Sequence, residues 1–184
     1  MCHTQRLSIS NNQIGDAGVT ALAEACARGA MAKCTHLYLN QNQIGDAGVA
    51  ALASACVSGA LSQCTYLGLA MNQIGDAGII SFADAFGSGA LPQCRELYLN
   101  SNKFGDAGVT ALALACASGS LARCTDLRLG FNQIGDAGFT ALAQVIKPVS
   151  EGSSWALPQL KDLCICAVHP ALRAACEARS ITYY

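Results

Sequence analysis

Residues 12–18 read Asn-Gln-Ile-Gly-Asp-Ala-Gly, and this stretch decides the fold because it returns at a fixed spacing. The same seven residues begin again at Asn42, Asn72 and Asn132, and a copy at Asn102 differs only by Lys and Phe in place of Gln and Ile. Each copy starts 30 residues after the one before it. A repeat of this length predicts stacked, near-identical units that share one continuous core.

Each unit combines the pattern of a short strand with that of a helix. In the second unit Leu37 and Leu39 alternate with polar or aromatic residues, which is typical of a strand with one buried face. An apolar stripe at helical spacing follows, formed by Val49, Leu52, Ala53 and Cys56. Asp46 stands where the N-cap of this helix is expected, and Gly59 follows its C-terminal end.

Strands that are joined by helices pair in parallel, with the helices in a second layer. Because strands lie about 4.8 Å apart and packed helices about 8–10 Å apart, the stack bends with its strands on the inside. We therefore predict an α/β solenoid, a horseshoe segment of five to six repeats with a parallel β-sheet on the concave face and α-helices on the convex face. The strands are expected near residues 7–9, 37–39, 67–69, 97–99, 127–129 and 163–165, within an array that spans residues 1–166.

The shared pattern L-x-L-x-x-N-x-I-G-D-x-G-x-x-x-L-A extends over residues 4–165. It resembles the leucine-rich repeats of the ribonuclease-inhibitor-like class. Similar repeats occur in NOD-like receptors and in Ran GTPase-activating proteins. The resemblance implies the horseshoe fold, and it leaves the function open.

The two ends of the array differ from its interior. The last strand pattern lies 36 residues after its predecessor, so six extra residues are expected within 147–154, where Pro148 ends the helix. Residues 167–184 are expected to form a C-terminal cap, with a short helix over 169–179, Pro170 in its first turn, and a last strand within 180–184. No matching cap precedes the first strand. Its edge is therefore a candidate for self-association, or the point at which a longer array continues.

Composition excludes several classes of partner. The 184 residues carry a formal net charge of −1 and their basic residues do not cluster, so neither nucleic acid nor an anionic membrane is expected to bind. No apolar run approaches the length of a membrane span, and the N-terminus lacks the pattern of a secretory signal. We expect a cytoplasmic protein without a cofactor.

The eleven cysteines mostly follow the repeat. One column holds Cys34, Cys64, Cys94 and Cys124, and a second holds Cys26, Cys56 and Cys116, with Phe86 and Ile146 at the equivalent places. Exchange with apolar residues predicts buried, reduced thiols. Cys164 and Cys166 instead point outward near His169, but this set lacks a fourth ligand, so we predict surface thiols of undetermined reactivity and no metal site.

Two polar rows also repeat. Asn12, Asn42, Asn72, Asn102 and Asn132 form a ladder, in which each amide is expected to bridge the backbones of neighbouring units. Asp16, Asp46, Asp76, Asp106 and Asp136 form a second row, which helix capping explains better than calcium binding does. No catalytic motif or paired acid and base is present, so we predict that the chain is not an enzyme.

The variable positions of the strand face are the candidate binding residues. They are His36, Tyr38, Asn40, Tyr66, Met71, Glu96, Tyr98, Asn100, Asp126, Arg128 and Phe131. The aromatic members are candidate anchors, and Gly68 and Ala70 are expected to leave a shallow dent between them. The outermost column changes from basic at Arg6 to acidic at Asp126, which would orient a partner.

The sequence thus favours a non-catalytic module that binds a protein partner of unknown identity through its concave strand face. The resemblance adds two alternatives. One is GTPase activation, for which Arg128, Asn40 and Asn100 are the polar candidates. The other is the sensor or autoinhibitory region of a NOD-like receptor. The near-identity of the repeats also leaves open an engineered scaffold without a natural partner.

Overall fold

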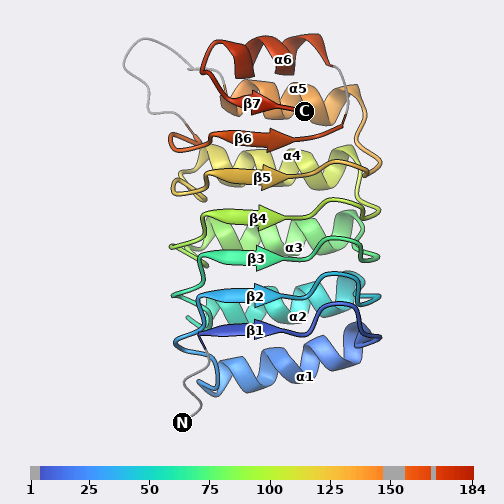
Figure 1. Ribbon diagram of the computed structural model, residues 1–184, viewed down its shortest axis with the longest axis vertical. Helices are drawn as coiled ribbons and strands as arrows, with labels where there is room; N and C mark the ends of the chain where they lie inside the picture. The colour runs from blue at the N-terminus through green and yellow to red at the C-terminus, as the bar shows by residue number, and fades with distance from the viewer. Residues whose placement is uncertain (1–4, 147–155, 167–168) are drawn as a thin grey trace.

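The computed structural model describes residues 5–146, 156–166 and 169–184. In these residues seven parallel strands form one sheet in chain order, and the helices lie behind it in a second layer (Figure 1). The strands are β1 (Arg6–Ser8), β2 (His36–Tyr38), β3 (Tyr66–Gly68), β4 (Glu96–Tyr98), β5 (Asp126–Arg128), β6 (Asp162–Cys164) and β7 (Thr182–Tyr183). The helices are α1 (Gly15–Ala27), α2 (Asp46–Val57), α3 (Asp76–Gly87), α4 (Asp106–Ala117), α5 (Asp136–Ile146) and α6 (Pro170–Glu177).

The central leucines of neighbouring strands lie side by side. Leu37 pairs with Leu67, and the row continues through Leu97, Leu127 and Leu163, all of them with no exposed surface. Each of the first six strands begins and ends one residue before the span near which it was expected. Main-chain hydrogen bonds between repeats continue past the strand ends, for example from the N–H of Leu39 to the oxygen of Gly68 at 2.8 Å and from the N–H of Gln41 to the oxygen of Ala70 at 2.9 Å.

A continuous hydrophobic core runs between the sheet and the helix layer through all the repeats. In α2 the buried residues include the whole predicted stripe, from Val49 to Cys56. Helices α1 and α6 lie beyond the terminal strands at the two ends of the stack (Figure 1). Packed helices are spaced more widely than paired strands, so the helix layer extends further than the sheet. The sheet therefore lies on the inner side of the curve. The α/β solenoid predicted from the sequence is confirmed.

The ladder asparagines bridge consecutive repeats at the turn after each strand. Asn72 Nδ2 donates to the carbonyl oxygen of Leu39 in the preceding repeat at 3.1 Å and to that of Leu69 in its own repeat at 3.0 Å. Asn72 Oδ1 accepts from the main-chain N–H groups of Asn42 and Ile44, at 2.9 and 3.1 Å. Each interior amide therefore satisfies backbone groups of two units that the turn leaves without a strand partner.

The aspartate row caps helices, but not in the way the sequence suggested. Asp46 is the first residue of α2, whose N-cap is Gly45, and its own helix receives no side-chain cap from it. Its Oδ1 instead accepts from the N–H groups of Gly75 and Gly78 in the next repeat, at 2.7 and 3.0 Å. A Cβ at Gly78 would lie 2.7 Å from this oxygen, so only glycine permits the approach. The prediction of a cap within one unit was wrong, because the N–H groups that the carboxylates of the first four repeats reach belong to the next unit.

The C-terminal end closes the stack with α6 and β7. Pro170 begins α6, and His169 Nδ1 accepts from the N–H of Leu172 at 3.4 Å, so this histidine serves as the helix N-cap. The predicted insertion at 147–154 and the N-terminal residues 1–4 lie outside the described residues. Within the part of the chain that is described, no helix is long and apolar enough to cross a membrane.

Candidate binding surface

Three rings from the neighbouring strands β2 and β3 stack on the face of the sheet that points away from the helices. The ring centroids of Tyr38 and Tyr66 are 4.5 Å apart, and His36 lies 6.2 Å from Tyr38 and 6.0 Å from Tyr66, nearly parallel to both. Strand pairing explains the contact, because β2 and β3 place His36 directly beside Tyr66. Neighbouring residues on one face of a sheet are close enough for aromatic contact.

The row of rings continues into a polar group on β4 and β5. Tyr98 meets Tyr66 edge to face at a centroid distance of 5.0 Å, and the guanidinium carbon of Arg128 lies 4.0 Å from the centroid of the Tyr98 ring. The Tyr98 hydroxyl donates to Asp126 Oδ2 at 2.9 Å, and Arg128 Nη2 forms an ion pair with the same oxygen at 3.0 Å. A cation over an aromatic face and a charge-assisted hydrogen bond both stabilise this arrangement.

These contacts define one group of residues, which we name the sheet-face cluster. It consists of His36, Tyr38, Tyr66, Glu96, Tyr98, Asp126 and Arg128.

The surroundings of Tyr98 in the cluster keep its hydroxyl group protonated. Burial raises the pKa of Tyr98, and the hydrogen bond to Asp126 raises it further. The same carboxylate raises the pKa of Arg128 through its hydrogen bonds, so the guanidinium stays charged. Glu96 and Asp126 supply two carboxylates against this one guanidinium. The polar end of the cluster is therefore net negative.

The dent expected at Gly68 is filled. A Cβ at Gly68 would lie 2.8 Å from Asn40 Oδ1 and 3.0 Å from a ring carbon of Tyr66, so these two side chains cover the glycine. Asn40 Oδ1 also accepts from the N–H of Ala70 at 2.9 Å. Asn40 is thus engaged in the sheet, and the expectation of a hollow between the anchors was wrong because larger neighbours close over small residues.

The structure does not bring all of the candidate residues together. Asn100 follows β4 beyond the cluster, and Met71 and Phe131 lie in the turns after β3 and β5 in the left-handed backbone conformation. Phe131 is 71 % exposed, and in the described residues no ring contact joins it to the tyrosines. Met71 belongs to a different surface feature.

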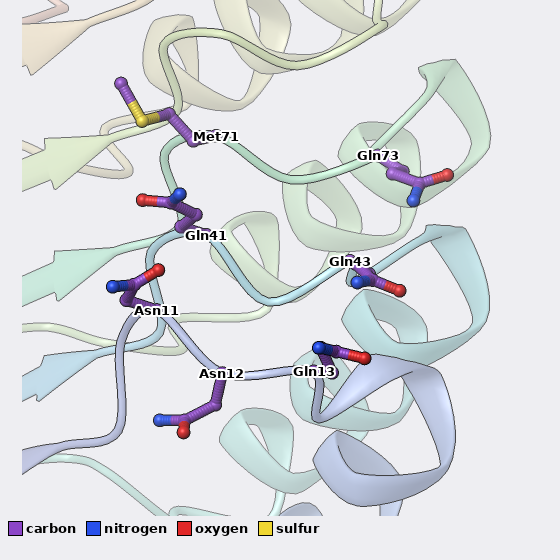
Figure 2. A pocket seen from close by; sticks show the side chains of 7 residues that line it. All are labelled: Asn11, Asn12, Gln13, Gln41, Gln43, Met71 and Gln73. Atoms are coloured by element: carbon purple, nitrogen blue, oxygen red, sulfur yellow. The ribbon is translucent and has the colours of Figure 1, made fainter.

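That feature is an open hollow along the turns that precede the first three helices, with a volume of about 460 Å³. Figure 2 shows two columns of side chains on successive turns, one near the ends of the strands and one near the helices. The lining residues are Asn11, Asn12, Gln13, Gln41, Gln43, Met71 and Gln73. Apart from Met71, the candidates chosen from the sequence did not include these residues. The signal that would have found them is the exposed Gln that follows a ladder Asn in each of the first three repeats.

Sequence comparison identifies the repeat unit that carries this surface. A family model described as Leucine Rich repeat matches residues 2–23, 35–53, 65–83, 95–113 and 125–143, together more than half of the chain. The chain belongs to the leucine-rich repeat family. No curated protein sequence matches it. From the second repeat on, each matched segment of the leucine-rich repeat array contains a strand, its ladder asparagine and the first part of a helix. The sheet-face cluster lies within these segments, at positions that differ between the repeats of this chain.

Proposed function

We propose that this leucine-rich repeat protein is a non-catalytic interaction module, and that the sheet-face cluster is where it binds a protein partner. Leucine-rich repeats generally mediate protein–protein interaction. The observation that carries the proposal is the unbroken chain of side-chain contacts from His36 through the three tyrosines to Arg128. Tyrosine and arginine are the residue types that most often dominate binding energy at interfaces, and mutual contact holds them in place before a partner arrives.

The chemistry of the cluster indicates the kind of surface it would accept. Its aromatic end offers the partly exposed rings of His36 and Tyr38 next to Tyr66, which is only 9 % exposed. Its other end has an excess of carboxylate charge, with Asp126 already partly neutralised by Arg128. We expect the complementary partner to bring an apolar or aromatic side chain to the tyrosines and a basic group to Glu96.

A double variant tests the proposal. Tyr38→Ala with Tyr98→Ala removes two rings of the cluster while it leaves every core leucine and ladder asparagine in place. Wild-type and variant chains are immobilised and exposed to a native lysate of the source organism, and the captured proteins are identified by mass spectrometry. We expect the protein that the wild type captures to be lost from the double variant, with an unchanged circular dichroism spectrum.

A matched control replaces exposed apolar residues on the helix layer. Val57 and Leu114 are 54 % and 66 % exposed on α2 and α4, so Val57→Ala with Leu114→Ala removes exposed apolar surface from the opposite side. This control should capture the same protein as the wild type. Capture by the tyrosine double variant, with loss in the helix-layer control, would place the interface on the helices and refute the proposal.

GTPase activation is the less favoured function. Arg128 is held by Asp126 and Asn40 by Ala70, and they lie on or next to β5 and β2, with two strands between. At about 4.8 Å a strand step, these groups are too far apart to act on one hydrolysed bond. Single-turnover GTP hydrolysis by a panel of small GTPases is expected to be unchanged by the added protein.

Three further parts of the proposal concern the class of repeat, the location and self-association. The α-helix in every repeat supports the ribonuclease-inhibitor-like class. A cytoplasmic location is supported by the ten cysteines of the described residues, all free and eight of them buried.

The β1 edge, where Leu7 is only partly buried while Leu37 is fully buried, supports self-association as a second mode of contact. Sedimentation at increasing concentration would detect it.

A further inference from the structure

Two thiols lie against each other at the end of β6. Cys164 is the last residue of this strand and is partly buried, and Cys166 is exposed two residues later. Their sulfur atoms are 3.7 Å apart. This separation is a contact between unbonded sulfurs, and a disulfide requires that it shorten to about 2.05 Å.

An early turn of the chain brings the two sulfurs together. After β5 the left-handed residue is Phe131, four positions beyond the central Leu127, and the earlier repeats share this spacing. After β6 it is Cys166, only three positions beyond Leu163, with φ of 58°. The N–H of Cys166 and that of the residue before it both donate to the main-chain oxygen of Tyr184, at 3.0 and 2.8 Å. The left-handed conformation is common to all these turns, so it is the shorter spacing that makes the turn after β6 different.

The neighbouring strand leaves room for the second thiol. The outward position after strands β2 to β5 is filled successively by Asn40, Ala70, Asn100 and Gly130. A Cβ at Gly130 would lie only 2.6 Å from Cys166 Sγ and 3.2 Å from the main-chain carbon of Ile165. Glycine is the only residue that fits here without displacing the sulfur. Two independent features therefore place the Cys166 thiol beside that of Cys164.

We propose that Cys164 and Cys166 are a peroxide-sensitive dithiol that closes reversibly to an intrachain disulfide. The Cys166 thiol gives its proton to solvent and the thiolate attacks one oxygen of hydrogen peroxide. The O–O bond breaks, a sulfenic acid forms, and the leaving hydroxide takes up that proton to give one water molecule. Cys164 Sγ then attacks Cys166 Sγ, the S–O bond breaks, and the hydroxyl leaves as a second water with the proton from Cys164. Overall, two thiols and one hydrogen peroxide give one disulfide and two water molecules.

The environment assigns the order of the two steps. Cys166 is exposed and is therefore the sulfur that peroxide reaches first. Burial raises the pKa of Cys164 to about 11, and its hydrogen bond with Cys166 contributes, so Cys164 keeps its proton until the second step. Deeper cysteines such as Cys94 and Cys124 are 1 % and 0 % exposed, and burial raises their pKa as well. They serve as internal references that peroxide should spare.

The dithiol adjoins the sheet-face cluster, although its chemistry does not depend on the proposed function. Cys164 is the register partner of Arg128 across β5 and β6. Closing the disulfide would change the surface next to the ion pair of Arg128 and Asp126. Oxidation can be measured without any partner, so failure of the proposed binding function would leave this inference standing.

Trypsin provides a direct assay, because cleavage after Lys161 and Arg173 gives a fragment with only these two cysteines. The fully reduced full-length chain is treated with limiting hydrogen peroxide, the remaining thiols are alkylated, and the digest is analysed by mass spectrometry. We expect this fragment to escape alkylation and to lose the mass of two hydrogen atoms, at least 10-fold faster than any buried cysteine is modified. Dithiothreitol should restore both alkylation sites.

Three variants separate a disulfide from other oxidation. Cys164→Ser and Cys166→Ser each leave one thiol, so neither fragment should lose two hydrogens. Gly130→Ala should slow closure several-fold, with circular dichroism verifying the fold. A wild-type fragment that stays reduced while other cysteines react, or that accumulates sulfinic acid or intermolecular disulfides instead, would overturn the proposal. An unchanged closure rate in Gly130→Ala would refute the role given to the glycine.

Discussion

The turns after the strands, which we call the turn edge, keep their ladder asparagine from repeat to repeat, whereas the residues of the sheet face vary. At the turn edge the same asparagine recurs five times, and each interior amide bonds to the backbone of its own unit and of the preceding one. On the sheet face almost every repeat has a different residue, and the side chains there contact one another in a single local cluster. Repetition therefore marks residues that hold the stack together, and variation marks residues that packing leaves free. The two sets should respond to mutation in opposite ways.

The largest expected effect on stability comes from removing the side-chain amide of an interior ladder asparagine. Asn72→Ala removes the bonds to Leu39 and Leu69 and leaves the N–H groups of Asn42 and Ile44 buried without an acceptor. We expect the free energy of unfolding to fall by about 3 kcal/mol, because each unsatisfied buried group costs about 1–3 kcal/mol. Urea titration followed by circular dichroism measures it.

Asn12→Ala is the matched control for this prediction. Asn12 is exposed, and its amide donates only to the carbonyls of Ile9 and Ser10 in its own repeat. Water can replace these bonds, so the expected loss is below about 1 kcal/mol. Equal losses of stability for the two variants would show that bridging between repeats contributes little. That result would contradict the view that the repeated asparagines hold the stack together.

A smaller effect is expected from the aspartate row. Asp46→Ala leaves the N–H groups of Gly75 and Gly78 without their carboxylate, and should cost about 2 kcal/mol, the upper range for loss of a helix cap. Asp136→Ala is the control, since no backbone N–H meets its carboxylate in the described residues, and it should change stability by less than about 0.5 kcal/mol. A large loss at Asp136 would count against capping between repeats as the role of the row.

These residues show what could be predicted from the sequence and why the rest could not. A period of 30 residues determines the stack, because only one arrangement buries every leucine in register. Asp46 was recognised as a capping residue, but its partner lies in the next unit, and linear spacing contains no information about offsets between units. The expectation of a dent at Gly68 was wrong for a similar reason. Whether Asn40 and Tyr66 close over a glycine depends on rotamers that no pattern specifies.

Gly68→Ala tests how far the sheet face is packed rather than free. The added methyl would lie 2.8 Å from Asn40 Oδ1 and would displace the acceptor of the Ala70 N–H. We expect a loss of about 1 kcal/mol, at the low end for overpacking, because the obstacle is the end of a side chain. Partner capture should also weaken, since Tyr66 shifts with it.

Gly87→Ala is the control for the added methyl. A Cβ there meets no atom within 4 Å at the end of α3, so this variant should be stabilised by about 0.4–1 kcal/mol through the unfolded chain. If Gly68→Ala were as stable as Gly87→Ala, the Asn40 side chain would be loosely held. The cluster would then be less preorganised than its contacts indicate.

The smallest effect is expected at Phe131, where the turn edge and the sheet face meet. Phe131 has φ of 57° and is 71 % exposed, and Asn11 occupies the equivalent position of the first repeat with φ of 61°. Asparagine tolerates this conformation better than an aromatic residue, so Phe131→Asn should stabilise the fold by about 0.5 kcal/mol. Because no ring contact in the described part of the chain joins Phe131 to a tyrosine of the sheet-face cluster, partner capture should be unchanged. Reduced capture with a stable fold would extend the interface beyond the sheet-face cluster onto the turns. A loss of stability above about 1 kcal/mol would instead assign Phe131 a packing role, on the side of the residues that hold the stack together.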